Sequence, residues 1–441
     1  MKDNILNNLE KFSKKYDIAK QEGTASFLMC ASIWVEGFCG KYFTDNYKTS
    51  QPGWFWLFSG CHGMHIFDEK AYSGTTEEQL NEFVKNKNTK VIKKYFQYEK
   101  EVKEKYSIFL KQKLDNLSNS NLRKEILAYA TLANKFSATS VFCEAMSNDI
   151  LIKYHPIFGG EDSKLDLFMN LCTSPIFESI AVRRDKLILK YLEQKRADYK
   201  KIQWIFSDYF STKRLDEIPG VLKSYKKSKL LKEINSNKKQ LEENISKYKE
   251  IEQFSLKIRN FIQFSQVCMK IRDNRRDAFS KLETILYNYV QEYFKRLNLN
   301  ENDIIHSFYP DFKREQDPAE YSKILQKRKK GVLMQFELGE KLKFTEEFCD
   351  FDSTREKIIS IIEGDKLQNQ EIKGQIASKG KSLGRVSIML SANDFKKFKK
   401  GDVIVASMTR PDYVPLMKEA SAIITDEGGI TCHAAIVARE L

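Results

Sequence analysis

The spacing of hydrophobic and polar residues predicts helices over most of the first half of the chain. Apolar residues between Ile5 and Tyr16 recur at intervals of three and four, as on one face of an amphipathic helix. Residues 77–117 alternate Lys, Glu and aromatic side chains, which indicates one long exposed helix or two. Residues 122–152 are more apolar, as in a buried helix. We therefore expect residues 1–220 to form helices joined by loops, a helical domain of unknown role.

An aromatic stretch at residues 49–63 interrupts this pattern. It holds Trp54 and Trp56 between Pro52-Gly53 and Gly60, and Pro and Gly favour turns. We interpret it as a loop whose aromatic rings fill the core beneath it. The alternative is that these rings form a wall facing a ligand.

The next stretch, residues 221–330, contains no Gly, and Pro occurs only at Pro310 and Pro318. Apolar residues from Leu241 to Ile262 follow spacings of three and four, which predicts a long antiparallel helical hairpin. A coiled-coil-like spacer is a sufficient role for its first thirty residues.

The pattern changes to strands after Lys330. Residues 331–349 predict a β-hairpin turning at Gly339-Glu340, and residues 331–368 are expected to be this hairpin and a linker. From residue 369 to 441 short β-branched runs are separated by glycines, as in an α/β domain. The expected fold is therefore multidomain: mainly α-helical in its N-terminal and central regions, followed by a C-terminal α/β domain.

Composition limits the class of protein. The chain has 441 residues, 41% hydrophobic and 30% charged, which is typical of a soluble globular protein. Its start lacks the apolar core of a signal peptide, and no early apolar run is long enough to span a bilayer. Eight cysteines without a C-x-x-C pair are typical of a reducing compartment. We expect a cytoplasmic protein that does not bind membranes.

The formal net charge of +14 raises the question of nucleic-acid binding. Residues 221–250 carry nine Lys and four Glu, and most other Lys residues also alternate with Glu along predicted helices. This distribution favours a solvated helical surface over a nucleic-acid footprint. The positive charge can still attract anionic nucleotides or pyruvate-type substrates.

One cluster has the residue types of a metal site. Cys61, His62 and His65 lie close together in C-H-G-M-H. Zinc sites usually have a second ligand pair at a recognisable spacing, and none follows here. We interpret the cluster as a packed turn and predict no metal site.

A group of arginines could bind an anion. Arg272, Arg275 and Arg276 fall within about a turn on one side of a predicted helix, where guanidinium groups can bind phosphate or carboxylate. They could equally form salt bridges with Asp273 and Asp277, which we favour slightly.

The last seventeen residues carry the strongest candidate for chemistry. They begin with a polar segment containing Gly428 and Gly429 and end in an Ala-rich run that predicts a helix. His433 would then lie in the first turn of that helix, where unpaired backbone N–H groups can hold an anion. Imidazole is also a nucleophile that can carry a covalent intermediate. On local spacing alone, a capping or packing role is the more common one for such a histidine.

This segment closely resembles the phosphohistidine signature of the phosphoenolpyruvate-utilising enzymes, the family of phosphoenolpyruvate synthase and pyruvate phosphate dikinase. Cys432 matches the synthase branch. Lys379 departs from the family, which commonly has Pro there. A looser similarity reaches back to residue 271 and includes the run of arginines. The positions that match the signature are Gly428, Gly429, Thr431, His433, Ala434, Ala435, Ala438, Arg439 and Glu440.

The resemblance implies that residues 369–441 form a swivelling domain whose His433 is phosphorylated. Gly428, Gly429, Thr431 and Cys432 would support the phosphoryl group. The resemblance also implies that Thr431 is a regulatory phosphorylation site. A simple helix cap at this threonine is equally compatible with the sequence.

Two elements of the full-length family enzymes have no counterpart here. No stretch resembles the ATP-grasp domain that charges the histidine or the barrel that binds phosphoenolpyruvate. The chain also stops after R-E-L, where the family continues with a further strand, so we expect a truncated domain. We expect no cofactor on this chain itself, with ATP and Mg²⁺ only at a partner or missing domain.

Two function classes follow from the sequence. The first is a phosphotransferase, or a component of one, that works with ATP-grasp and phosphoenolpyruvate-binding domains in trans or in missing sequence. The second is a non-catalytic helical interaction protein with a relict mobile domain. The intact histidine motif favours the first, and the absent donor and acceptor domains favour the second. The sequence leaves the oligomeric state open.

Overall fold

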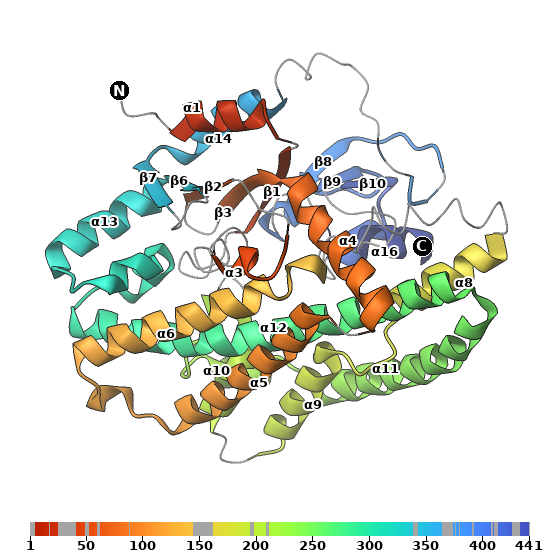
Figure 1. Cartoon of the computed structure of the whole chain (residues 1–441), viewed down its shortest axis with the longest axis horizontal. Coiled ribbons are helices and arrows are strands. Elements are labelled where there is room, and N and C mark those ends of the chain that lie inside the picture. The colour runs from red at the N-terminus through yellow and green to blue at the C-terminus, as the bar shows by residue number, and fades with distance from the viewer. Residues whose placement is uncertain are drawn as a thin grey trace.

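The structure is a computed structural model of the whole chain, in which a helical body, an antiparallel sheet and a smaller C-terminal sheet are distinguished (Figure 1). None of the described helices is both long and apolar enough to cross a membrane. The described residues are 5–16, 18–24, 41–48, 53–59, 62–87, 89–143, 162–194, 198–208, 211–337, 343–363, 374, 376–378, 380–389, 392–406, 409, 413–425 and 433–440.

The body is built around one long helix, α12, which contains neither Gly nor Pro over its 41 residues. Helices α5 and α6 pack along it. The Tyr95 hydroxyl donates to the Ile271 carbonyl at 3.0 Å, and the rings of Phe136 and Phe279 lie 5.2 Å apart. The helices of the body are α3 (Lys41–Thr44), α4 (Glu69–Asn86), α5 (Lys90–Lys111), α6 (Asn119–Ala138), α8 (Asp162–Thr173), α9 (Ile180–Leu192), α10 (Ile218–Lys223), α11 (Lys227–Tyr248), α12 (Leu256–Arg296) and α13 (Pro318–Lys330).

Several helix predictions are confirmed. The stretch 77–117 holds two helices, the end of α4 and all of α5. The helix predicted at 122–152 corresponds to α6, which is largely buried and ends at Ala138, and residues 144–152 lie outside the described residues. The predicted hairpin corresponds to α11 and α12, but these two helices do not pack against each other as a coiled coil. Helix α11 packs mainly on α9, and Ile245, one of the apolar residues expected between the two helices, is 46% exposed.

The first half of the chain also contains strands, which corrects the expectation of helices and loops alone. A five-stranded antiparallel sheet has the order β1-β3-β2-β6-β7. Strand β2 pairs with β6, so that Trp56 lies opposite Met334 from far along the chain. The strands are β1 (Ile18–Thr24), β2 (Gly53–Ser59), β3 (His62–Asp68), β6 (Val332–Glu337) and β7 (Lys343–Phe348).

The aromatic stretch read as a loop contains β2, a central strand of this sheet. Phe55 and Leu57 point to one face, where α1 (Ile5–Ser13) and α14 (Phe351–Glu363) cover them. Trp54, Trp56 and Phe58 point to the other face and join the core of the body. Because both faces are buried, β2 is apolar throughout and lacks the alternation that marks a half-buried strand. The aromatic side chains do fill the core, as expected.

The predicted hairpin after Lys330 is confirmed as β6 and β7, and its expected turn at Gly339-Glu340 lies outside the described residues. The expected linker begins with a helix, α14, which packs against α1. Figure 1 places α1 and α14 together on the far side of the sheet from the helical body. The domain boundaries remain predictions.

The C-terminal region forms a separate small α/β unit, which confirms the expected fold class. Its three parallel strands have the order β10-β9-β8. One face of this sheet packs a small core that includes Met389, Ile404, Tyr413 and Ala434. The elements are β8 (Val386–Met389), β9 (Val403–Ala406), α15 (Val414–Met417), β10 (Ala422–Thr425) and α16 (His433–Glu440).

Candidate functional site

His433 is the first residue of helix α16, as the sequence predicts. Strand β10 ends at Thr425, so the connection from the carboxyl end of a parallel strand to this helix spans residues 426–432. That connection contains Gly428, Gly429, Thr431 and Cys432 and lies outside the described residues. A strand end followed by a helix start is the place where α/β sheets commonly bind anions, because free N–H groups and the helix dipole meet there.

The face of α16 that follows the histidine is fixed by packing. Ala434 and Ala435 are 7% and 3% exposed, and Val437, one turn on, packs against the same core as Ala434. Helix α16 contacts β10, and its alanines are small enough to allow a close approach to the sheet. The start of the helix is thus held by buried apolar contacts beside the sheet, which is the kind of support a precisely placed catalytic group requires.

At the opposite end of this sheet, where the strands begin, Asp402 links neighbouring segments of the chain. Its carboxylate accepts hydrogen bonds from Ser387 Oγ at 2.6 Å and the Lys399 backbone N–H at 2.8 Å, and it forms an ion pair with Arg385. The Arg385 and Ser387 hydrogen bonds hold the pKa of the Asp402 carboxyl well below its ordinary value. The sequence pattern alone did not single out this carboxylate.

Two glycines shape the same end of the sheet. Gly401 has φ of +87°, a conformation that favours glycine. At Gly384 a Cβ atom would lie 2.4 Å from the Gly401 carbonyl oxygen and 2.6 Å from Ser421 Oγ. The glycine at 384 therefore allows the chain entering β8 to approach the backbone of the turn before β9.

The predicted arginine group lies on α12 in the helical body, whereas α16 packs on the C-terminal sheet. The two aspartates expected to pair with these arginines contact α9. Asp273 accepts from the Ile180 backbone N–H at 2.9 and 2.8 Å and pairs with Arg183 at 2.9 Å. Asp277 pairs with Lys281 and lies 3.6 Å from Arg183. Helix α12 thus uses its carboxylates to anchor the start of α9, and anion binding by Arg272, Arg275 and Arg276 remains a prediction.

The metal-like cluster is only partly described. Cys61 lies outside the described residues, and His62 and His65 belong to β3, a strand and not the expected turn. The His65 ring lies 5.7 Å from that of Trp54 and 4.9 Å from that of Trp56, and burial lowers its pKa to about 4. The described residues contain no group of three or more His, Cys, Asp or Glu side chains that could hold a metal ion.

Comparison with known proteins gives matches at the C-terminal end. Residues 398–441 match the family model of the PEP-utilising enzyme, mobile domain. A probable phosphoenolpyruvate synthase of Pyrococcus horikoshii is 50% identical over 90 residues, which are 20% of this chain and 10% of that protein. A phosphoenolpyruvate synthase of Aeropyrum pernix is 59% identical over 71 residues, 16% of this chain and 9% of that protein.

A third relative carries a broader name. The uncharacterized phosphotransferase YvkC of Bacillus subtilis is 46% identical over 88 residues, 20% of this chain and 11% of that protein. The chain therefore spans about a tenth of the length of these relatives, and the similarity concerns the short C-terminal region. Within that limit, residues 398–441 match the mobile domain of the PEP-utilising enzyme family.

Proposed function

We propose that this chain is a phosphotransferase component in which His433 carries a phosphoryl group between a nucleotide donor site and a pyruvate- or phosphoenolpyruvate-type site. One observation carries the proposal: a histidine is the first residue of a helix that follows the carboxyl end of a parallel strand, within the matched mobile domain. The names of the relatives, phosphoenolpyruvate synthase and phosphotransferase, support this class of reaction.

The proposed transfer has two steps. In the first, an imidazole nitrogen of His433 attacks the phosphorus of the donor, a phosphorus–nitrogen bond forms, and the bond to the leaving oxygen breaks with its electron pair on that oxygen. In the second, an oxygen of the acceptor attacks the phosphorus, the phosphorus–nitrogen bond breaks, and its electron pair returns to the imidazole nitrogen. The start of α16 and Gly428 and Gly429 would hold the phosphoryl oxygens through backbone N–H groups.

Donor and acceptor sites are assigned to other domains. No stretch of this sequence resembles an ATP-grasp domain, and we place ATP and its Mg²⁺ on such a domain in trans or elsewhere in a longer protein. A phosphoenolpyruvate-binding barrel would supply the acceptor site. A carrier that visits two separate sites requires a domain that moves as a unit, and we propose that role for residues 369–441.

Labelling tests the carrier. The full chain, mixed with an ATP-grasp domain and labelled ATP, or with a barrel domain and labelled phosphoenolpyruvate, should acquire acid-labile, base-stable label. His433→Ala should abolish this label, and His155→Ala, a change at a histidine outside the motif, should retain it. Label that survives in His433→Ala would place the carrier elsewhere. An unlabelled natural sequence with both donors would favour the non-catalytic interaction protein.

We also propose that phosphorylation of Thr431 regulates the carrier. A phosphate of about −2 charge two residues before His433 would repel an incoming phosphoryl group. Thr431→Glu should therefore slow the labelling of His433 by about tenfold or more, and Thr431→Gln, which has similar size without the charge, should slow it less. Equal labelling rates in the two variants would remove the basis for regulation by charge.

A further inference from the structure

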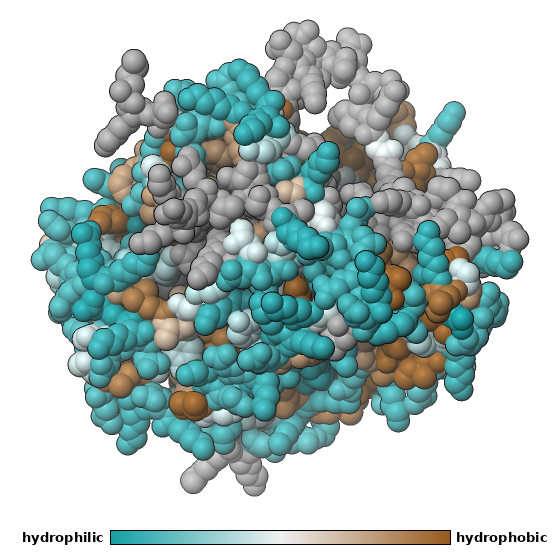
Figure 2. Space-filling view, viewed as in Figure 1, coloured by the Kyte–Doolittle hydropathy of each residue, from teal (hydrophilic) through white to brown (hydrophobic). Residues whose placement is uncertain are grey.

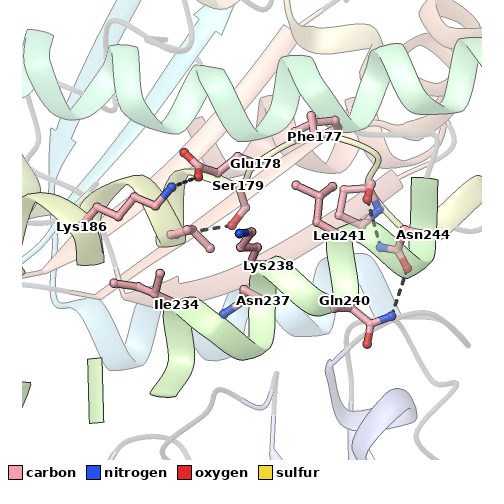
Figure 3. Close-up of a pocket in the computed structure, with 12 residues that line it drawn as sticks. Phe177, Glu178, Ser179, Lys186, Ile234, Asn237, Lys238, Gln240, Leu241 and Asn244 are labelled. Atoms are coloured by element: carbon pink, nitrogen blue, oxygen red, sulfur yellow. Dashed lines mark hydrogen bonds and ion pairs between the residues drawn. The ribbon is translucent and has the colours of Figure 1, made fainter. Parts of the chain in front are cut away.

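A cavity in the helical body lies between α11 and the chain that leads into α9. Its volume is about 290 Å³, close to the lower end of the range for small-molecule pockets. Its apolar wall comes from Phe177, Val182, Ile234 and Leu241. Figure 3 shows Leu241 rising from α11 toward the segment that carries Phe177. The space suits a molecule of small-metabolite size.

The walls of this cavity are fixed before any ligand binds. Asn244 of α11 donates from Nδ2 to the Pro175 carbonyl at 3.0 Å. From the other side, Gln266 of α12 donates to the Ser174 carbonyl at 2.9 Å, and Asp273 accepts from the Ile180 N–H. Two helices therefore hold the segment at both ends. Such preorganisation lowers the conformational cost of binding.

The polar groups at the cavity leave one positive charge without a described partner. Lys186 forms an ion pair with Glu178. Lys238 extends from α11 toward Ser179 (Figure 3), and no carboxylate in the described part of the chain forms an ion pair with it. Ser179 Oγ accepts weakly from the Val182 N–H at 3.5 Å, so its hydroxyl hydrogen is available to a ligand.

The chemistry of the walls selects a class of ligand. An ammonium group and a hydroxyl donor beside each other match a carboxylate, and a wall of Phe, Val, Ile and Leu matches an apolar body. Figure 2 shows hydrophilic residues over most of the face in view, with hydrophobic patches toward the lower right, the side on which α9 and α11 lie. A ligand that covers apolar surface here gains free energy in proportion to the area buried.

We propose that this cavity binds a small monocarboxylate with an aromatic or branched aliphatic body. The carboxylate contacts Lys238 and Ser179, and the apolar body lies against Phe177, Ile234 and Leu241. The site acts independently of His433, so its test does not depend on the proposed phosphoryl transfer.

Phenylacetate is a suitable probe, with phenylacetamide as its uncharged counterpart, in calorimetric titration of the full chain. A ligand of this size in a preformed pocket should bind with a Kd of about 1 mM. Lys238→Gln should weaken phenylacetate by about three- to fivefold and leave phenylacetamide unchanged, the range of a partly exposed ion pair. Leu241→Ala should weaken both probes alike.

Lys239→Gln is the matched control, because Lys239 neighbours Lys238 on α11 but does not line the cavity, and its ammonium group lies 3.9 Å from Glu243. It should bind both probes like the natural sequence. Absence of saturable phenylacetate binding at about ten times the expected Kd would overturn the proposal. So would equal losses in the Lys238→Gln and Lys239→Gln variants, since general surface charge would then explain the binding.

Discussion

The antiparallel sheet of the body and the parallel sheet of the C-terminal unit are covered differently. In the first sheet, α1 and α14 cover one face and the helical body covers the other. In the second, one face packs the core that holds α16, whereas Val386, Ile388 and Ile424 on the opposite face are 57%, 58% and 53% exposed. The body has two buried layers, and the described C-terminal unit has one.

This difference suggests that the body provides most of the stability, whereas the C-terminal unit carries the proposed chemistry. Long-range side-chain contacts, such as those of Arg328, tie the elements of the body together. In the C-terminal unit a few short contacts, at Asp402 and Gly384, hold three four-residue strands and the helix that starts at His433. Variants in the two regions should therefore affect different properties, and this expectation can be tested.

The largest effect is expected at Arg328 in the body. Its side chain is 3% exposed, pairs with Asp311 at 2.7 Å and lies 3.2 Å from Glu346. Arg328→Met would leave the Asp311 carboxylate poorly compensated in a buried site and should lower the free energy of unfolding by about 3–5 kcal/mol. Urea unfolding followed by tryptophan fluorescence measures this, because Trp54 and Trp56 are buried in the body.

Arg314→Met is the control for this change, because Arg314 is an exposed arginine of the same region. It should alter the free energy of unfolding by less than about 0.5 kcal/mol. If the two variants unfold alike, the buried network around Arg328 does not hold the body together.

An intermediate effect is expected at Gly384 in the C-terminal unit. A Cβ atom there would lie 2.4 Å from the Gly401 backbone oxygen. A backbone atom cannot move aside as the end of a flexible side chain can. Gly384→Ala should lower the stability of the C-terminal unit by about 1–3 kcal/mol, the usual cost of overpacking, without changing the unfolding of the body. Hydrogen exchange of the β9 amides should accelerate, while that of α12 amides stays the same.

Gly374→Ala tests whether space is the cause, since a Cβ at Gly374 meets nothing within 4 Å. This variant should leave exchange in both regions unchanged. Accelerated exchange of α12 amides in Gly384→Ala would show that the body and the C-terminal unit unfold together. That result would contradict the expectation that variants in the two regions affect different properties.

Elements with local sequence signals could be predicted, whereas elements that depend on distant partners could not. The start of α16 at His433 was predictable because its signals are local: a glycine-containing segment followed by an Ala-rich run. Strand β2 was missed because its partner β6 is far along the chain and because both its faces are buried, which removes the period-two pattern. The pairing of Asp273 with Arg183 was missed for a related reason: sequence spacing favours neighbours on one helix, and this contact joins two helices.

The smallest effect is expected from titration of Asp402. Its folded-state pKa is lowered by the hydrogen bonds from Arg385 and Ser387, so the folded unit binds a proton less readily than the unfolded chain. Such a group contributes stability above the pKa of the unfolded carboxyl, about 3.9, and loses that contribution as pH falls toward the folded pKa. The β9 amides should therefore exchange faster, after correction for intrinsic rates, as pH falls below about 4.

The Asp402→Asn variant tests whether titration of Asp402 causes this pH dependence. The variant lacks the titrating group, so it should be less stable than the natural sequence at pH 7, and the difference between the two should shrink below pH about 4. Glu419→Gln, a change at an exposed carboxylate of the same unit, should keep the pH dependence of the natural sequence. The difference in stability between Asp402→Asn and the natural sequence could instead stay constant from neutral to acidic pH. The charge of Asp402 would then not stabilise the amino-terminal end of the sheet, and the contact with Arg385 would act through shape alone.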